Sequence, residues 1–207
     1  MATPSLSIIV LALIGQAPGP IVPTVVHPDL PSQFAAAALE AGRVGDSVAM
    51  ACQILAEGVP LCFRVESEGK REWFSLAEAS AWGLTLETLG QAVVVSSEKN
   101  PLVEKNVVDG GHWWQVEAKD GRESFIFLNP TWLDRVGDLA VVAMPAAGVV
   151  IAWQSGDDAN DKIMAVGVRA LYDQAEAPVT PKIFRHSDEG WTVWGELVPE
   201  VAPAKVP

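Results

Sequence analysis

The chain is poor in the residues that most often carry catalysis or hold metals. It has only two cysteines and three histidines, His27, His112 and His186. No histidine pair stands at helical spacing and the cysteines are not closely spaced, so no metal site is expected. A glycine-rich phosphate loop, a Gly-x-Ser-x-Gly elbow and internal repeats are missing too. These shortages leave no visible nucleophile, and no cofactor is expected.

Positive charge is scarce as well. Lysine and arginine together number 14 against 26 aspartates and glutamates, which gives a net charge of -12. A nucleic-acid backbone or an anionic lipid surface would be repelled at long range, so no nucleic acid is expected as a partner. What the chain does have is 49% hydrophobic residues and eight tryptophans in 207 residues. That composition predicts a folded core of ordinary domain size.

The opening residues leave two interpretations. The apolar run 6–14, followed by Gly15 and Ala17, is typical of a signal peptide, although the basic segment that should precede it is missing. The run is shorter than the about 20 residues that span a bilayer, so no integral membrane span is expected. The alternative for 1–17 is a buried strand. A proline-rich segment over 18–31, expected as a linker outside any sheet, favours an exported or periplasmic protein over a cytoplasmic one.

Cys52 and Cys62 also leave two alternatives. An oxidising compartment would allow one disulfide between them. Cys52 is expected on the apolar face of a helix over 46–57, and Cys62 in the strand that follows. We favour two buried thiols, because free cysteine is among the most buried residue types and needs no partner.

The order of apolar runs and turn signals predicts an α+β fold, with a mainly antiparallel sheet built from hairpins and helices packed on it. A single domain is expected over 32–198, followed by a flexible tail over 199–207. A capping box at Ser75 and Glu78 begins one of the helices. The expected helices are 33–41, 46–57, 76–82, 85–99, 129–137 and 157–174. The expected strands are 60–66, 70–75, 106–108, 112–118, 122–128, 139–144, 148–153, 181–186 and 191–197, with 139–144 and 148–153 at the sheet centre.

The densest acidic cluster, from Asp157 to Asp161, is interpreted as a helix cap. A calcium loop would need a glycine and a closing glutamate that this segment lacks. Negative charge is favourable at the first turn of a helix. Two apolar lines of the helix are expected to face inward. They are Ile163, Val166 and Ala170, and Met164, Val168 and Leu171.

Three segments carry a family resemblance. They are "FSLAEASAWGLTLETLGQAVV", "FLNPTWLDRVGDLAVVAMPAAGVVIAW" and "LYDQAEAPVTPKIFRHSDEGW". From Phe74 to Trp194 the chain resembles the bacterial family of YtpQ-like proteins, a domain of unknown function. The resemblance covers a little over half of the chain. It implies an α+β fold and no particular activity.

Two histidines stand next to acidic residues at predicted turns. His112 follows Asp109, and His186 precedes Asp188. Either pair would supply a general base, so a small hydrolase or ligand-modifying enzyme is the alternative function. The simpler interpretation is that these residues are exposed polar groups beside tight turns, and we favour it.

Tryptophans offer the other candidate surface. Trp113 and Trp114 are adjacent in a strand and must face opposite sides of the sheet, and Trp191 and Trp194 are expected to do the same. Exposed tryptophan marks interaction surfaces, whereas the other explanation is that all eight fill the core or cover sheet faces. Trp73, Trp82, Trp132 and Trp153 are expected in the core. The sequence therefore favours a non-enzymatic module that binds a protein partner, with no indication of its oligomeric state.

Overall fold

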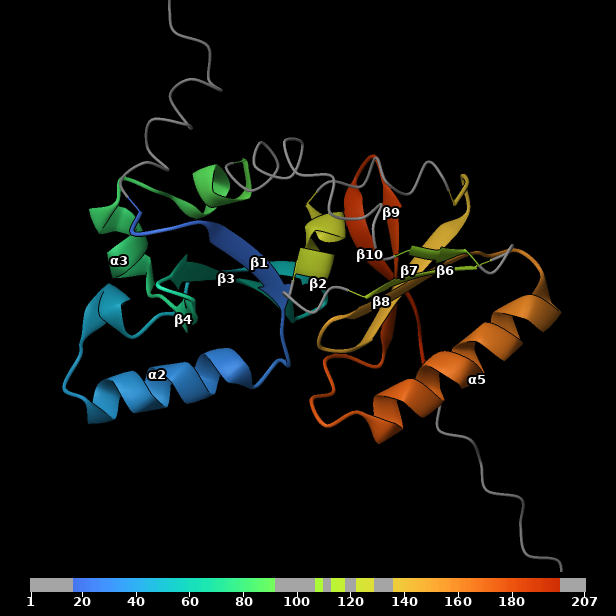
Figure 1. Cartoon of the computed structure of the whole chain (residues 1–207), viewed down its shortest axis with the longest axis horizontal. Helices are drawn as coiled ribbons and strands as arrows, with labels where there is room; N and C mark the ends of the chain where they lie inside the picture. Colours follow the sequence, from blue (N-terminus) through green and yellow to red (C-terminus); the bar gives the residue numbers. More distant parts are fainter. Residues whose placement is uncertain (1–16, 92–106, 110–112, 118–121, 129–135, 198–207) are drawn as a thin grey trace, which may run out of the picture.

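The computed structural model describes residues 17–91, 107–109, 113–117, 122–128 and 136–197. These residues form two antiparallel sheets with helices packed against them, which confirms the α+β fold (Figure 1). The expected helix over 129–137 and the tail over 199–207 lie outside the described residues, apart from the end of the former. The apolar run 6–14 lies outside them as well.

The smaller sheet has the strand order β1-β3-β2, with β4 also paired to β3. Its strands are β1 (Ile21–Val25), β2 (Cys52–Ala56), β3 (Val59–Ser67) and β4 (Lys70–Trp73). The expectation of a linker over 18–31 is wrong, because β1 pairs with β3 along its whole length and places Pro23 opposite Phe63. Proline is tolerated there because β1 is an edge strand with β3 as its only strand neighbour in the described sheet.

The segment before β3 also differs from expectation. The predicted helix over 46–57 is wrong, since the structure has a short 3-10 helix, η1 (Gly45–Ser47), followed by strand β2. Glu57 and Gly58 both have positive φ and make the tight turn that joins β2 to β3. The apolar residues of this segment match helical spacing, but pairing with β3 places them in a strand, in which Ile54 is exposed. Helix α2 (Leu30–Glu40) begins three residues before the predicted 33–41.

Local signals predicted the next elements correctly. The strands β3 and β4 form the expected hairpin through Glu68 and Gly69, which both have positive φ. Ser75 and Glu78 form the predicted capping box of α3 (Leu76–Ala81): the Ser75 hydroxyl accepts the Glu78 N–H, and the Glu78 carboxylate accepts the Ser75 N–H at 2.8 Å. A further helix follows over 86–91, where the described segment ends.

The larger sheet has the order β10-β9-β7-β8-β6-β5. Its strands are β5 (Val107–Asp109), β6 (Trp113–Glu117), β7 (Ala140–Ala146), β8 (Val149–Gln154), β9 (Lys182–Ser187) and β10 (Gly190–Glu196). The prediction that the two most apolar runs occupy the centre is confirmed, since β7 and β8 are neighbours flanked by β9 and β6. The strand expected over 122–128 is instead a 3-10 helix, η2 (Arg122–Phe127). Strand β6 has β5 and β8 on its two sides, so this segment cannot pair with β6 as a hairpin partner.

Helix α5 (Asp158–Gln174) covers one face of the larger sheet. Asp157 caps it as predicted, since its carboxylate accepts the N–H groups of Ala159 and Asn160. The predicted inward faces are only partly correct. Val168 is buried and Met164 packs against the sheet. The other four residues, Ile163, Val166, Ala170 and Leu171, are exposed.

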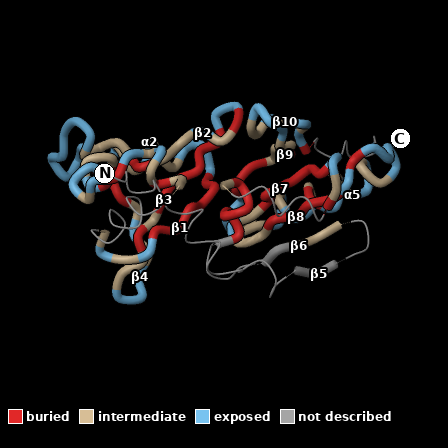
Figure 2. Tube along the Cα trace, turned by 90° about the horizontal axis from the view of Figure 1, so that it is seen from above, coloured by how far each residue is buried: buried red, intermediate tan, exposed pale blue. Residues whose placement is uncertain are grey.

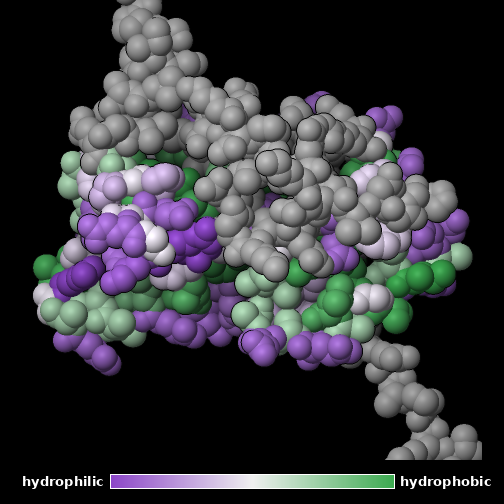
Figure 3. Space-filling model, in the orientation of Figure 1, coloured by the Kyte–Doolittle hydropathy of each residue, from purple (hydrophilic) through white to green (hydrophobic). Residues whose placement is uncertain are grey.

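A hydrogen bond explains how α5 is rotated. The indole N–H of the fully buried Trp153 donates to the Asp161 carboxylate at 2.8 Å. This fixes the helical line of Asp161, Met164 and Val168 against the sheet. The opposite line is left in solvent, and hydrophobic atoms gather along α5 in Figure 3.

The two sheets share one hydrophobic core. Val25 and Leu61 of the smaller sheet and Val142, Met144 and Phe184 of the larger sheet belong to the same buried cluster. Buried residues run through the centre of both sheets in Figure 2. This continuity fits a single domain with two parts, between which a functional site can form.

Candidate functional site

A cavity of about 580 Å³ lies beside the smaller sheet. It is bordered by α2, by the end of β1, by β3 and β4, and by the turns before β8 and β9. Val26, Leu30 and Val179 give it apolar walls, and Gly148 and Pro178 contribute from the larger sheet's turns. Small-molecule and peptide sites have volumes of about 300–1,000 Å³, so this cavity is large enough to hold a ligand.

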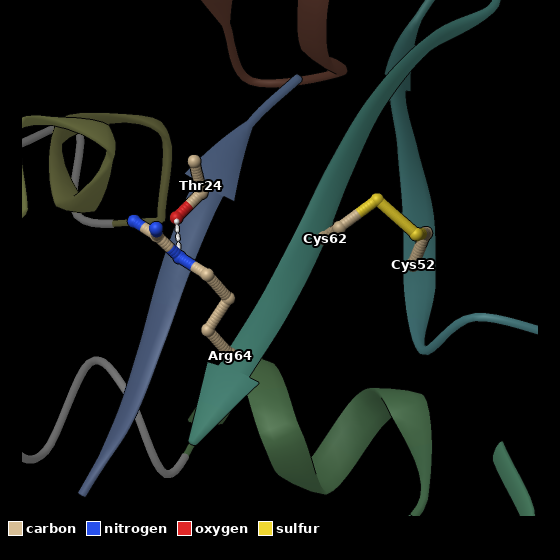
Figure 4. Close-up of a disulfide and its surroundings, with 4 residues drawn as sticks. All are labelled: Thr24, Cys52, Cys62 and Arg64. Atoms are coloured by element: carbon tan, nitrogen blue, oxygen red, sulfur yellow. Dashed lines mark hydrogen bonds between the residues drawn. A yellow bond between two sulfur atoms is a disulfide. The ribbon is translucent and has the colours of Figure 1, made fainter. Parts of the chain in front are cut away.

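Arg64 is a polar group of this cavity that two neighbouring side chains hold in place. Its Nε donates to the Thr24 hydroxyl at 3.1 Å (Figure 4), and its Cζ lies 5.0 Å from the ring centroid of Trp73. Trp73 stands opposite Arg64 in the β3–β4 register, and Thr24 is in the neighbouring strand β1. Among the described residues, no acceptor is in hydrogen-bond contact with the two terminal nitrogens of Arg64. Thr24 and Trp73 therefore hold the guanidinium of Arg64 in place, and its two terminal nitrogens can bind a ligand.

The surroundings of Arg64 lower its pKa. Burial is the largest cause, the positive charge of Arg71 is the next, and Glu123 and Glu66 offset part of the shift. An arginine remains protonated in a protein all the same. An anion bound in the cavity would counter this shift by stabilising the charged form.

Arg71 and Glu123 complete the charged lining. Arg71 Nε lies 3.7 Å from the Glu66 carboxylate. Glu123 is 3% exposed and accepts the Gly148 N–H at 3.2 Å, which fixes the β7–β8 turn at the cavity. Two guanidinium groups and one carboxylate therefore line the cavity, in a chain whose net charge is -12. With Glu66 counted, the charges at the cavity are close to balanced, whereas the whole chain is strongly acidic.

His27 also lines the cavity, near the start of α2. Its Nδ1 accepts the Asp29 N–H at 3.3 Å, and the Asp29 carboxylate lies 3.6 Å away. The side chain of His27 is 48% exposed. The structure therefore places this histidine, from the segment expected as a linker, partly exposed at the border of the cavity.

Sequence reasoning missed this cavity because its residues look like ordinary polar positions of a hairpin. One signal was available. The hairpin register pairs Arg64 with Trp73 and Glu66 with Arg71, so a stacked cation and an ion pair share one face of the sheet. What the hairpin alone does not show is that α2 and the larger sheet enclose that face.

The predicted histidine–carboxylate pairs do not line this cavity. His112 lies outside the described residues, and Asp109 ends β5 opposite Trp114. His186 stands on β9, with its ring centroid 5.1 Å from that of Trp191. Asp188 is exposed in the following turn, and no hydrogen bond or ion pair joins it to His186 in the described structure.

The four candidate binding tryptophans face opposite sides of the larger sheet, as predicted. Trp113 packs toward the α5 side and Trp114 toward the smaller sheet. Trp191 donates from its indole to the Phe127 carbonyl at 2.8 Å, while Trp194 packs edge-on against Trp153. Trp194 is 37% exposed and the other three are half-buried, so the described tryptophans form no broad exposed patch.

Trp153 is the only one of the tryptophans expected in the core that is fully buried in the described structure. Trp73 is half-buried and lines the cavity instead. Trp82 is half-buried against Phe74 with ring centroids 4.9 Å apart. Trp132 lies outside the described residues.

Cys52 and Cys62 form a disulfide with an S–S distance of 2.04 Å, so the expectation of two free thiols is wrong. The reason is the correction to β2. In a strand rather than a helix, Cys52 stands directly opposite Cys62 (Figure 4). The disulfide lies beside Trp73 in a small cluster under α2 and fixes β2 to β3 next to the cavity.

Comparison of the chain with protein-family models, curated proteins and solved structures finds no match. The resemblance to YtpQ-like proteins therefore stays a prediction. In the described parts of the chain, no helix is both long and apolar enough to cross a membrane. The described histidines, cysteines and carboxylates form no group of three or more that could hold a metal ion.

Proposed function

We propose that the protein is a non-enzymatic interaction module that holds a segment of a protein partner in the cavity beside Arg64. The observation that carries this proposal is the guanidinium of Arg64, held by Thr24 and Trp73, whose two terminal nitrogens have no hydrogen-bond acceptor among the residues that the structure describes. An acidic group of the partner would bind there. Apolar side chains of the partner would pack against the walls of the cavity.

The hydrogen bonds of His27 and Glu123 hold backbone groups, which favours a binding role for the cavity. His27 Nδ1 accepts the Asp29 N–H near the start of α2. One carboxylate oxygen of Glu123 accepts the Gly148 N–H and so holds the turn between β7 and β8.

The cavity also replaces the tryptophan faces as the proposed contact surface. Trp114 and Trp191 pack on the core cluster between the two sheets. Trp194 lies against Trp153 and beneath the guanidinium of Arg185, whose Cζ is 5.5 Å from its ring. These packed tryptophans support the sheet, and a partner would meet few of their ring atoms.

A displayed library of random decapeptides tests the proposal. We expect the wild-type protein to enrich peptides that combine apolar residues with an acidic group. Binding of the enriched peptides should fall sharply in Arg64→Gln. The matched control is Arg43→Gln, which removes an exposed arginine that does not line the cavity and should bind like the wild type.

Two results would contradict the proposal. One is enrichment of peptides whose binding is the same in Arg64→Gln and in the wild type. The other is cleavage of the bound peptides, seen as new masses after incubation with the protein. Cleavage would instead support the alternative function, a hydrolase with a histidine–carboxylate pair such as His186 with Asp188.

A further inference from the structure

We infer that the acidic group recognised in this cavity is a single carboxylate at the end of an apolar chain, which in a protein partner is the free C-terminus. The inference rests on the proposed function and names the chemistry of the ligand. It follows from the donor geometry of Arg64, from the charges around the cavity, and from the apolar walls.

The donor geometry selects a planar anion with two oxygens. A guanidinium offers paired N–H groups along two usable edges, and the edge that includes Nε is occupied by the Thr24 hydroxyl. Trp73 covers one face of the group. The edge left over is formed by the two terminal nitrogens, which together match the two oxygens of a carboxylate.

The charges around the cavity select a single negative charge. Arg71 is already close to the Glu66 carboxylate, and the Glu123 carboxylate is part of the lining. The two guanidinium groups are thus matched in number by two carboxylates, and no excess positive charge is left to neutralise a dianion. A phosphate with a charge of about -2 would leave excess negative charge beside Glu123 and would also be repelled by a protein of net charge -12.

The apolar walls select the end of a chain over an internal acidic residue. An internal aspartate or glutamate brings polar backbone groups on both of its sides into contact with the walls. Val26, Leu30 and Val179 offer these groups no hydrogen-bonding side chains. A terminal carboxylate has backbone on one side only, and the last side chain can pack against these walls while the carboxylate reaches Arg64.

Titration calorimetry tests the inference with four probes. They are the acetylated tetrapeptide Gly-Ala-Val-Leu with a free C-terminus, the same peptide as a C-terminal amide, hexanoate, and inorganic phosphate. We expect the free acid to bind about 10- to 100-fold more tightly than the amide, the loss typical of a hydrogen-bonded charge. Phosphate is expected to bind more weakly than the free acid.

Variants test whether the preference for the acid over the amide comes from the paired N–H groups of Arg64. Arg64→Lys keeps the charge but offers no paired N–H edge, so the preference for the acid over the amide should largely disappear. Arg43→Gln should preserve it. Circular dichroism, together with a thiol assay of the Cys52–Cys62 disulfide, shows that each variant is folded.

Each outcome distinguishes this inference from the proposed function. Equal binding of acid and amide, with both lost in Arg64→Lys, would overturn the inference and leave the interaction module standing. Phosphate binding as tight as that of the free acid would overturn it too. Tight binding of hexanoate without binding of the tetrapeptide would support carboxylate recognition and contradict a protein partner. No binding of any probe would overturn the inference.

Discussion

The two sheets use their faces in different ways. In the larger sheet, β7 and β8 are buried on both faces, by α5 on one side and by the shared core on the other. In the smaller sheet, β3 places Leu61 and Phe63 in the core, but Cys62 packs under α2 and Arg64 lines the cavity. The central strands of the larger sheet are covered on both faces and therefore support the fold. The face of the smaller sheet that carries Arg64 keeps polar groups, and a ligand can be held there.

The two parts are also held together by different interactions. The larger sheet depends mainly on apolar burial. The smaller sheet has less core of its own and adds a disulfide, the Ser75–Glu78 capping box and a hydrogen bond from the Val25 N–H to the Ser124 hydroxyl at 3.0 Å. Substitutions of matched size in the two parts therefore test whether this division of roles is real.

The largest effects are expected from the cores. Phe184 in the larger sheet and Phe63 in the smaller are both 0% exposed. Replacing either by alanine should lower the free energy of unfolding by about 3–5 kcal/mol. Because one buried cluster joins the sheets, both variants should shift a single transition in urea, followed by circular dichroism and tryptophan fluorescence. Ile163→Ala, at a residue 70% exposed, is the control. Two separate transitions would show that the sheets unfold independently.

Removal of the disulfide should affect stability next most strongly. The cross-link closes a loop with a sequence separation of 10. Its loss in a Cys52→Ala, Cys62→Ala variant should destabilise the fold by about 2–3 kcal/mol, because the unfolded chain regains freedom. Urea unfolding with and without a reducing agent measures this, and the double variant should not respond to the reductant. A difference smaller than the fitting error would mean that β2 is held mainly by its packing.

The hydrogen bond between Ser124 and Val25 should have a smaller effect. Ser124→Ala leaves the buried Val25 N–H without its acceptor, which should destabilise by about 1–3 kcal/mol. Ser80→Ala, at an exposed position, should change stability little. Amide hydrogen exchange gives a direct readout, because protection of the Val25 N–H should decrease in Ser124→Ala. Unchanged protection would contradict the assigned role of this bond.

The helix caps should give the smallest effects. Asp157→Ala removes two hydrogen bonds from the start of α5, and Ser75→Ala removes the capping box of α3. Each should cost about 1 kcal/mol in urea unfolding. The loss at Ser75 should be the larger because this residue is fully buried. Equal losses would indicate that burial does not strengthen the cap. The exposed Asp158→Ala is the comparison for Asp157→Ala.

Sequence reasoning succeeded where one local signal was sufficient. The capping box at Ser75, the cap at Asp157 and the hairpins around Gly69 and Gly190 depend on neighbouring residues only, and all four are present. The centre of the larger sheet was predictable as well, because uninterrupted apolar strands must be buried on both faces.

It failed where pairing partners decided the outcome. The apolar residues of 46–57 fit a helix and a strand equally well, and only pairing with β3 selects the strand. The disulfide was missed for the same reason. Strand β1 was missed because its proline argued against a sheet, although an edge strand tolerates it.

The sequence by itself determined the α+β class, the caps, the tight turns, the acidic charge and the apolar central strands, because these depend on composition and on contacts between near neighbours. Only the tertiary structure decided that Cys52 meets Cys62, that Asp161 rotates α5, and that Arg64 lines a cavity bordered by α2 and by turns of the larger sheet. Those features join residues that are distant along the chain, and no local preference specifies which distant partner a residue will meet.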